Sequence, residues 1–389
     1  MKSRPGLVAV LVAPVVLVGW AANARGGTWT ADLGTTRTVE SKVLGRAMTV
    51  RVHLPSGYER SSGRYPVFLV MGSEIEPRTT AVVATLDALA DAGQIPPMLF
   101  VGVDLPEGNG VFVPRPPELD VSGMDRHLAF LVDELLPMLD REYRTAPFRV
   151  LSGASNSGLF AVWSFLSRPD AFNATIATSP LLGWCPELVS EKAKKLKGPG
   201  GEKAKRWLAL VWSDNDYEEA RVPLPAFVAL LGDGRAPWLD VTTLQRAGEG
   251  HVPVVDVPLA LGAIFPDYAP RGTPATLADL LGRYAALSQR YGFTIKAPSD
   301  TLFETGLTLL TAMRLEEARP VFEHFVKAHP DDARGYVGMG LVAKLSDHLE
   351  KAREWFEKAL EVDPSSGMAK RQLDRLAPRP AQPPAGTGS

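Results

Sequence analysis

Short apolar stretches alternate with longer amphipathic stretches between residues 49 and 270. The short stretches have a strand-like length and composition: Thr49–Leu54, Val67–Met71, Met98–Val103, Phe148–Leu151, Ala174–Thr178, Trp207–Trp212 and Leu239–Gln245. Helix-like stretches such as 79–92 and 124–139 separate them. This alternation predicts an α/β fold, a mostly parallel sheet with helices on both faces. Catalytic loops gather at the carboxyl ends of the strands in such a sheet, so we expect functional residues there.

A second pattern recurs with an offset of 34 residues near the C-terminus. The paired positions hold the same residue types: Leu315, Ala318, Phe322 and Pro330 recur as Leu349, Ala352, Phe356 and Pro364, and Gly306 recurs as Gly340. Small residues let paired helices approach closely, and the phenylalanines fill the contact between them. The spacing resembles that of the tetratricopeptide repeat. It predicts a small all-α module of two repeats, completed by a capping helix at Gly367–Leu376 and able to bind a protein partner.

These two patterns divide the chain into segments. We expect the α/β domain at 25–270, a connecting helix and linker at 271–298, the two repeats with their capping helix at 299–376, and a disordered polar tail at 377–389.

The first 24 residues have the parts of a secretory signal peptide. Lys2 and Arg4 precede an apolar run, and Ala22-Asn23-Ala24 offers the small residues that signal peptidase requires. We therefore expect export to the periplasm or the medium. The apolar span of residues 5–22 is 18 residues long, at the lower edge of what can cross a bilayer, so an uncleaved membrane anchor is the lesser alternative.

Composition and charge exclude several classes of partner. The chain has 389 residues, of which 45% are hydrophobic and 22% charged, as in a globular protein with a large core. A formal net charge of −2 gives no electrostatic basis for binding nucleic acid or an anionic membrane. Cys185 is the only cysteine, so neither an intrachain disulfide nor a cysteine-rich metal site can form.

Ser155 lies where a strand-like stretch breaks at small residues and continues as a helix-like one. A serine on such a sharp turn has a strained backbone, and the residues two before and two after it must be small. Gly153 and Ser157 meet this requirement, although the residue two after the serine is normally glycine. The pattern predicts a nucleophile elbow with Ser155 at its tip.

A serine nucleophile needs a general base, usually histidine. Three of the six histidines fall in the repeat region, His53 alternates within a strand, and His127 sits on a helix. His251 alone follows a strand and lies in a glycine-flanked turn. We expect it to be the base.

The third member would be an acid on the loop between the serine and the histidine. The strand Trp207–Trp212 opens into a loop that holds Asp214, Asp216 and Glu218. The order Ser155, then Asp214 or Asp216, then His251 fits that of the α/β-hydrolases. We favour Asp216, because the first polar residues after a strand more often brace the turn.

Ordered blocks of sequence carry a resemblance to a known family. They are Glu40–Arg46, Val52–Tyr58, Arg64–Val70, Phe130–Pro137, Tyr143–Pro147, Arg168–Phe172 and Ala177–Pro180 with Trp184. Residues 38–270 resemble the enterochelin-esterase and esterase-D-like branch of the α/β-hydrolases. The resemblance implies an α/β-hydrolase fold and an ester hydrolase with Ser155 as nucleophile and His251 as base. Relatives include siderophore, feruloyl and acetyl-xylan esterases, S-formylglutathione hydrolases and mycolyltransferases, and the fold does not choose among them.

The chain departs from this family at Ala154 and Ser157, and at Met71-Gly72, where an Asp-Gly pair is common. Backbone amides stabilise the oxyanion in such enzymes and survive a change of side chain. By analogy, the donors would be the amides of Asn156 and of Ser73 or its neighbour.

The sequence thus predicts an exported serine carboxylic-ester hydrolase that forms an acyl-enzyme at Ser155, acts on a small-molecule ester and needs neither cofactor nor metal. One alternative is an inactive hydrolase domain whose repeats serve binding. Another is an acyltransferase that uses the same three residues, Ser155, Asp216 and His251.

Overall fold

The computed structural model describes residues 33–376 except 60, 75, 116–118, 199–204, 233–236, 253–254, 270–271 and 273–275. The expected signal peptide at 1–24 and the expected tail at 377–389 lie outside the described residues.

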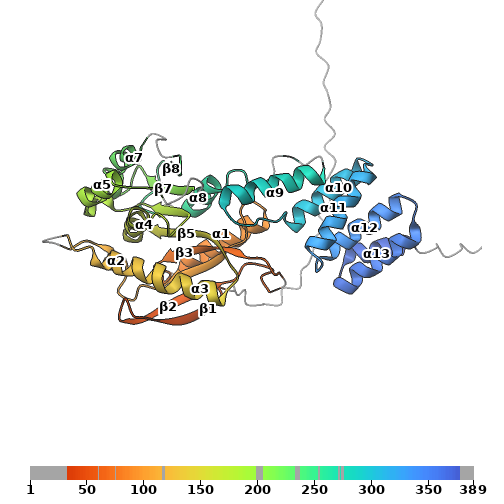
Figure 1. The fold of residues 1–389 in the computed structure, drawn as a ribbon, viewed down its shortest axis with the longest axis horizontal. Helices are drawn as coiled ribbons and strands as arrows, with labels where there is room; N and C mark the ends of the chain where they lie inside the picture. Colours follow the sequence, from red (N-terminus) through yellow and green to blue (C-terminus); the bar gives the residue numbers. More distant parts are fainter. Residues whose placement is uncertain are drawn as a thin grey trace, which may run out of the picture. The chain divides into compact units, whose positions relative to one another are not determined.

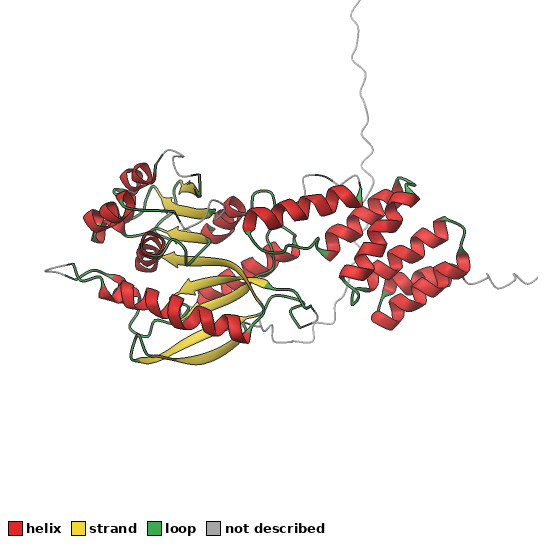
Figure 2. Cartoon of the chain, viewed as in Figure 1, coloured by secondary structure: helices red, strands yellow, loops and turns green. Residues whose placement is uncertain are grey.

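An eight-stranded sheet forms the centre of the first part of the chain (Figures 1 and 2). Its strands are β1 Thr35–Ser41, β2 Arg46–His53, β3 Tyr65–Met71, β4 Leu99–Val103, β5 Thr145–Ala154, β6 Ala174–Thr178, β7 Arg206–Ser213 and β8 Leu239–Arg246. They are ordered β1-β2-β4-β3-β5-β6-β7-β8. The pairs β1–β2 and β2–β4 are antiparallel and all others are parallel, so the expected mostly parallel sheet is confirmed.

Helices cover both faces of this sheet, as expected. Successive residues of a strand point to opposite sides, so one strand contributes side chains to two cores. On β3, Val67, Leu69 and Met71 face one core, whereas Phe68 and Val70 face the other. The first core is covered by α2 Ser122–Ala129, α3 Leu136–Glu142, α4 Asn156–Ser167, α5 Pro186–Lys194 and α7 Leu224–Leu231. The second is covered by α1 Glu76–Asp91, α8 Asp256–Ile264 and α9 Leu277–Tyr291, and the same cluster continues into the helices that follow residue 298. Short helical turns η1 Asn109–Phe112, η3 Leu182–Trp184 and α6 Glu218–Arg221 lie between these elements.

The helix expected at 124–139 contains a π-helical turn, η2 Phe130–Leu135, between α2 and α3. Pro137 lies at the start of α3. It has no N–H, and its ring would clash with the carbonyl four residues earlier in an α-helix, which the wider turn avoids.

The segment expected to be a connecting helix and linker packs on the sheet. The Tyr291 ring, at the end of α9, lies 5.3 Å from that of Trp207 and 5.8 Å from that of Phe148. The Phe293 ring lies 5.6 Å from that of Phe148. Residues 277–297 therefore contribute aromatic side chains to the second core of the α/β region.

Five helices follow: α10 Ser299–Thr311, α11 Leu315–Ala328, α12 Ala333–Leu345, α13 Leu349–Val362 and α14 Gly367–Leu376. The bounds of α12 and α13 are those of α10 and α11 plus 34 residues. A Cβ at Gly306 would lie 2.4 Å from the Phe322 ring, and one at Gly340 would lie 2.3 Å from the Phe356 ring. The close helix contacts expected from the sequence recur with the same spacing.

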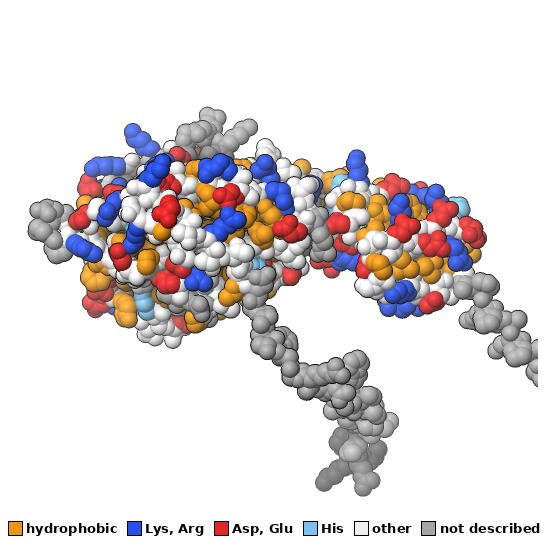
Figure 3. All heavy atoms as spheres, turned by 90° about the horizontal axis from the view of Figure 1, so that it is seen from below, with side chains coloured by type: hydrophobic (Ala, Val, Ile, Leu, Met, Phe, Trp, Pro, Cys, Tyr) orange, Lys and Arg blue, Asp and Glu red, His pale blue; other side chains and the backbone are white. Residues whose placement is uncertain are grey.

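The surface shows no dominant charge on the face drawn in Figure 3, where acidic and basic side chains are interspersed. Within the described ranges, no helix is both long and apolar enough to cross a membrane.

Candidate active site

Ser155 occupies a strained turn between β5 and α4. It has φ +60° and ψ −123°, a positive-φ conformation that is unfavourable for a residue with a Cβ. Its amide donates to the Thr178 carbonyl at 2.9 Å, which ties the turn to the neighbouring strand β6. This is the geometry expected of an elbow, which holds the hydroxyl above the carboxyl ends of the strands.

Two glycines make this turn possible. A Cβ at Gly153 would lie 2.0 Å from the Ser157 carbonyl oxygen, and a Cβ at Gly158 would lie 2.8 Å from that of Thr178. Both distances are shorter than any tolerated contact, so each position requires glycine. Ser157, at the position where the pattern normally has glycine, is accommodated with its side chain beside a cavity.

The structure brings Ser155, His251 and Asp216 together. The Nε2 atom of His251 lies 2.9 Å from the Ser155 hydroxyl oxygen, and its Nδ1 atom lies 2.6 Å from Asp216 Oδ1. Asp216 follows β7 and His251 follows β8, and these strands are parallel neighbours whose carboxyl ends meet at one edge of the sheet. The arrangement can pass a proton from the serine to an imidazole braced by a carboxylate.

Asp216 and Asp214 have different environments. The side chain of Asp216 is fully buried, and its Oδ1 also accepts the Tyr217 amide at 2.9 Å. Asp214 instead accepts the amide of Gly248 at 2.8 Å. Asp214 thus links the loops after β7 and β8, whereas Asp216 contacts the imidazole. Glu218 begins α6.

Other histidines form hydrogen bonds elsewhere. His53 pairs with Asp87 at 3.0 Å, and the His127 ring bonds the Gly123 carbonyl at 2.7 Å. His127 is buried, and loss of solvent lowers the pKa of its ring below the usual value.

Two residues that the sequence analysis did not single out hold His251 in place. The Tyr217 ring stacks on the imidazole with centroids 4.3 Å apart and is itself 59% exposed. The amide of Val252, the next residue after His251, donates to the Ser179 hydroxyl at 3.0 Å. Ser179 is fully buried and has φ +46°. The Thr-Ser-Pro segment after β6, part of the family resemblance, was the available signal for Ser179.

The amides considered as oxyanion donors, those of Asn156 and of Ser73 or its neighbour, differ in their hydrogen-bond partners. Asn156 is the first residue of α4, where amides have no intrahelical acceptor. The Ser73 amide, in contrast, donates to the Val103 carbonyl at 3.2 Å. The next amide, that of Glu74, donates to no other described residue.

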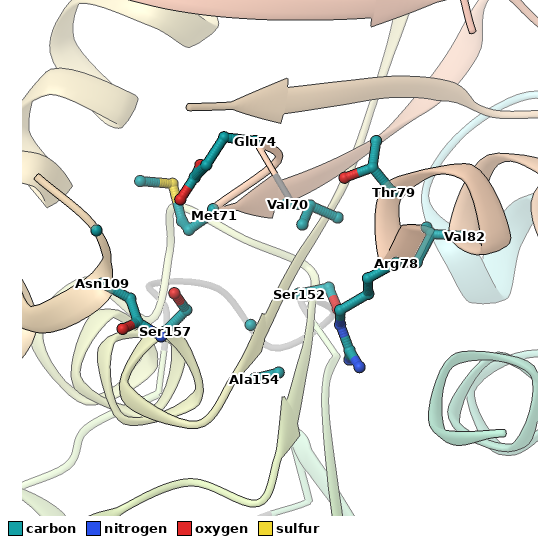
Figure 4. A pocket seen from close by; sticks show the side chains of 13 residues that line it. Val70, Met71, Glu74, Arg78, Thr79, Val82, Asn109, Ser152, Ala154 and Ser157 are labelled. Atoms are coloured by element: carbon teal, nitrogen blue, oxygen red, sulfur yellow. The ribbon is translucent and has the colours of Figure 1, made fainter. Parts of the chain in front are cut away.

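A cavity of about 160 Å³ opens beside the elbow (Figure 4). It is bounded by the ends of β3 and β5, the start of α1, and the first turn of α4. Its polar lining includes Glu74, Arg78, Asn109, Ser152 and Ser157. Within the described part of the chain, no group of three or more His, Cys, Asp or Glu side chains could hold a metal ion.

Comparison with known proteins identifies the family. The sequence profile of the family described as "Putative esterase" matches residues 41–238, about half of the chain. The chain belongs to this esterase family. It is therefore a hydrolase of the esterase family with an α/β-hydrolase-like fold followed by a helical region. No protein with a curated description matches it.

Solved structures share the fold of this esterase-family chain. An IroE-like serine hydrolase from Shewanella oneidensis is 21% identical with a TM-score of 0.62, and the match covers 75% of this chain and 99% of that one. An uncharacterised protein from Capnocytophaga ochracea is 17% identical with a TM-score of 0.57, covering 88% of this chain and 99% of that one. The second match is too long for residues 1–298 alone, so it includes part of the C-terminal helices.

Proposed function

We propose that the protein is a serine carboxylic-ester hydrolase that works through an acyl-enzyme at Ser155. The observation that carries the proposal is the continuous chain of contacts from the Ser155 hydroxyl through both His251 nitrogens to the buried Asp216 carboxylate, at 2.9 and 2.6 Å. A strained serine backed by an oriented imidazole is the arrangement that activates a hydroxyl for attack on an acyl carbon.

In the proposed reaction, Ser155 Oγ attacks the ester carbonyl while its proton passes to His251 Nε2. The Asp216 carboxylate accepts the Nδ1–H of the imidazole, fixes the tautomer that can take this proton, and stabilises the imidazolium. Collapse of the tetrahedral intermediate breaks the bond to the alcohol oxygen, which receives the proton from Nε2. Water, deprotonated by the same imidazole, then attacks the acyl carbon, and the bond from this carbon to Ser155 Oγ breaks as Oγ takes the proton back from Nε2 and the carboxylic acid leaves.

The oxyanion of the tetrahedral intermediate needs two N–H donors. We assign one to Asn156, whose amide lies at the unpaired start of α4. The second comes from the turn after β3. Since the Ser73 amide would have to release the Val103 carbonyl, we favour its neighbour Glu74, the second possibility left by the sequence.

Hydrolysis of p-nitrophenyl acetate and butyrate tests this function. Ser155→Ala should lower kcat/KM by at least about 10⁴, to a level near the buffer rate. Ser190→Ala, a half-buried serine on α5, is the matched control and should retain wild-type activity. Equal rates for the wild type and Ser155→Ala would contradict the proposal.

We also propose export, on the strength of the N-terminal sequence alone. Lys2 and Arg4, the apolar run after them and Ala22-Asn23-Ala24 support cleavage after residue 24. N-terminal sequencing of the protein from the native cell envelope and medium tests this. A mature chain whose first residue lies between Ala21 and Thr28 would support cleavage. An intact Met1 in a membrane fraction would favour the anchor.

We further propose that α10–α13 are two tetratricopeptide repeats that bind a protein partner. Their support is the 34-residue recurrence of helix bounds and of the contacts Gly306–Phe322 and Gly340–Phe356. A partner captured by the full chain should be lost when residues 299–389 are deleted. Retention by the truncated chain would place the binding surface elsewhere.

A further inference from the structure

The cavity beside the elbow contains a hydroxyl, that of Ser157, without a hydrogen-bond partner among the described residues. Ser157 is only 3% exposed, and its Oγ forms no hydrogen bond with another described residue although it lines the cavity. The residue as a whole is buried, but its side chain lines the cavity, where a polar group can reach the hydroxyl. In Figure 4 the Ser157 side chain points across the cavity toward Glu74. The hydroxyl is therefore placed to bond a group that enters the cavity.

Glu74 offers a free carboxylate oxygen on the opposite wall. Its Oε2 accepts the Leu105 amide at 2.9 Å, which fixes the side chain, while Oε1 forms no bond with another described residue. A Cβ built at Gly72 would lie 3.8 Å from Glu74 Oε1 and 3.7 Å from Ser157 Oγ. Gly72, whose φ of +85° favours glycine, therefore lies beside both oxygens and places no side chain against them.

The charge of Glu74 is not balanced by the cation that shares the cavity. Arg78 also lines it, but its guanidinium pairs with Asp256 at 2.5 Å. Asp256 is 2% exposed and also accepts the Thr178 hydroxyl, so Arg78 is held by a buried carboxylate. The cavity therefore presents an acceptor oxygen with a net negative charge.

The sheet order places His251 and the cavity on opposite sides of β5. His251, which protonates the leaving alcohol, follows β8 on one side of β5, whereas the cavity lies between β5 and β3 on the other side. With the alcohol on the histidine side and the oxyanion at the amides of Asn156 and Glu74, the acyl group is the part of the ester left to extend into the cavity.

We propose that Glu74 and Ser157 form an acyl subsite that recognises a hydrogen-bond donor, an ammonium or a hydroxyl, on a short acyl chain. The inference rests on the proposed function, since it assumes that the acyl group is carried by Ser155. A cavity of about 160 Å³ is comparable with one that holds a single benzene ring, so the acyl group is small. The substrates are then esters of small amino or hydroxy acids rather than of long-chain fatty acids.

Two pairs of p-nitrophenyl esters test the subsite, each differing by one isosteric replacement. The 3-aminopropanoyl ester is compared with the butanoyl ester, and the 3-hydroxybutanoyl ester with the 3-methylbutanoyl ester. Each kcat/KM is divided by the rate constant for hydroxide hydrolysis of the same ester, because the polar substituents activate the carbonyl by themselves. We expect the wild type to prefer the ammonium ester by about tenfold to a hundredfold and the hydroxyl ester by about twofold to tenfold.

Variants assign the preference to its residues. Glu74→Gln should bring the ammonium ratio to within about threefold of unity, and Ser157→Ala should lower the hydroxyl ratio. Glu187→Gln, an exposed carboxylate on α5, should keep the wild-type ratios. Because each readout is a ratio within one variant, a partly folded variant does not mimic the effect.

The outcomes separate this inference from the proposed function. Hydrolysis of all four esters with wild-type ratios near one, or ratios unchanged in Glu74→Gln, would overturn the subsite and leave the esterase intact. Hydrolysis of none of them, with Ser155→Ala equal to the wild type, would overturn the esterase and the subsite together.

Discussion

Replacing Asp216 by asparagine tests the proposed role of its carboxylate with almost no change in shape. The Asp216 side chain is fully buried, and its Oδ1 lies 2.6 Å from His251 Nδ1. An asparagine amide can donate to Nδ1, which leaves the proton on Nε2. The protonated Nε2 atom then faces the Ser155 hydroxyl as a hydrogen-bond donor, so it cannot accept the serine proton.

The size of the loss follows from two contributions. A charge-assisted hydrogen bond of this kind contributes about 1.5–3 kcal/mol, and the wrong tautomer removes the general base from most molecules. We expect Asp216→Asn to lower kcat by roughly two to four orders of magnitude, equivalent to about 2.7–5.4 kcal/mol in the activation barrier. KM should change by less than about threefold, since Asp216 does not line the cavity.

Asp214→Asn is the matched control, two residues away on the same loop. Asp214 bonds the Gly248 amide rather than the imidazole, so its replacement should cost at most about tenfold in kcat. Steady-state hydrolysis of p-nitrophenyl butyrate at pH 8, with circular dichroism to verify folding, measures both variants. A large loss in Asp214→Asn with little loss in Asp216→Asn would refute the assignment. Near wild-type kcat in both would favour a Ser155–His251 dyad.

Three further predictions concern the Tyr217 ring, the glycine before the elbow and the helices after residue 298. Tyr217→Ala should lower kcat by about twofold to thirtyfold, because the stacked ring stabilises the imidazolium, whereas Tyr217→Phe should stay within about twofold; equal losses in both would contradict a role for the ring. Gly153→Ala should lower the free energy of unfolding by about 3 kcal/mol or more, while Gly282→Ala, with open space in α9, should raise it by up to about 1 kcal/mol, as measured by urea unfolding. A chain truncated after Pro298 should hydrolyse p-nitrophenyl butyrate within tenfold of the full chain, and an insoluble product would show that the repeats complete the core.

The sequence was informative about the site because of where its residues lie relative to the strands. Ser155, Asp216 and His251 each follow a strand-like stretch, and the carboxyl ends of parallel strands meet at one edge. Their approach to within hydrogen-bonding distance could therefore be expected from order alone. The choice between Asp216 and Asp214 rested on a tendency of turns, and only the three-dimensional course of the loop shows which carboxylate faces the imidazole.

Other features depend on contacts that no local pattern records. Strand β1 is mostly exposed and polar, so it has no apolar signal, and it is defined by pairing with β2. Tyr217 and Ser179 meet the His251 loop from separate segments of the chain. In the sequence, residues 277–297 have the pattern of an ordinary amphipathic helix and linker. Only the contacts of Tyr291 and Phe293 with Phe148 show that this segment packs on the sheet.

Labelling with a fluorophosphonate tests the central claim most directly, because this reagent phosphonylates a serine only when a neighbouring base activates it. Intact-mass analysis of the purified protein should show one adduct per chain, and peptide mapping should place it on Ser155. His251→Ala should label far more slowly, and Ser155→Ala should not label at all. An unlabelled wild type, or an adduct that persists in Ser155→Ala, would contradict the account.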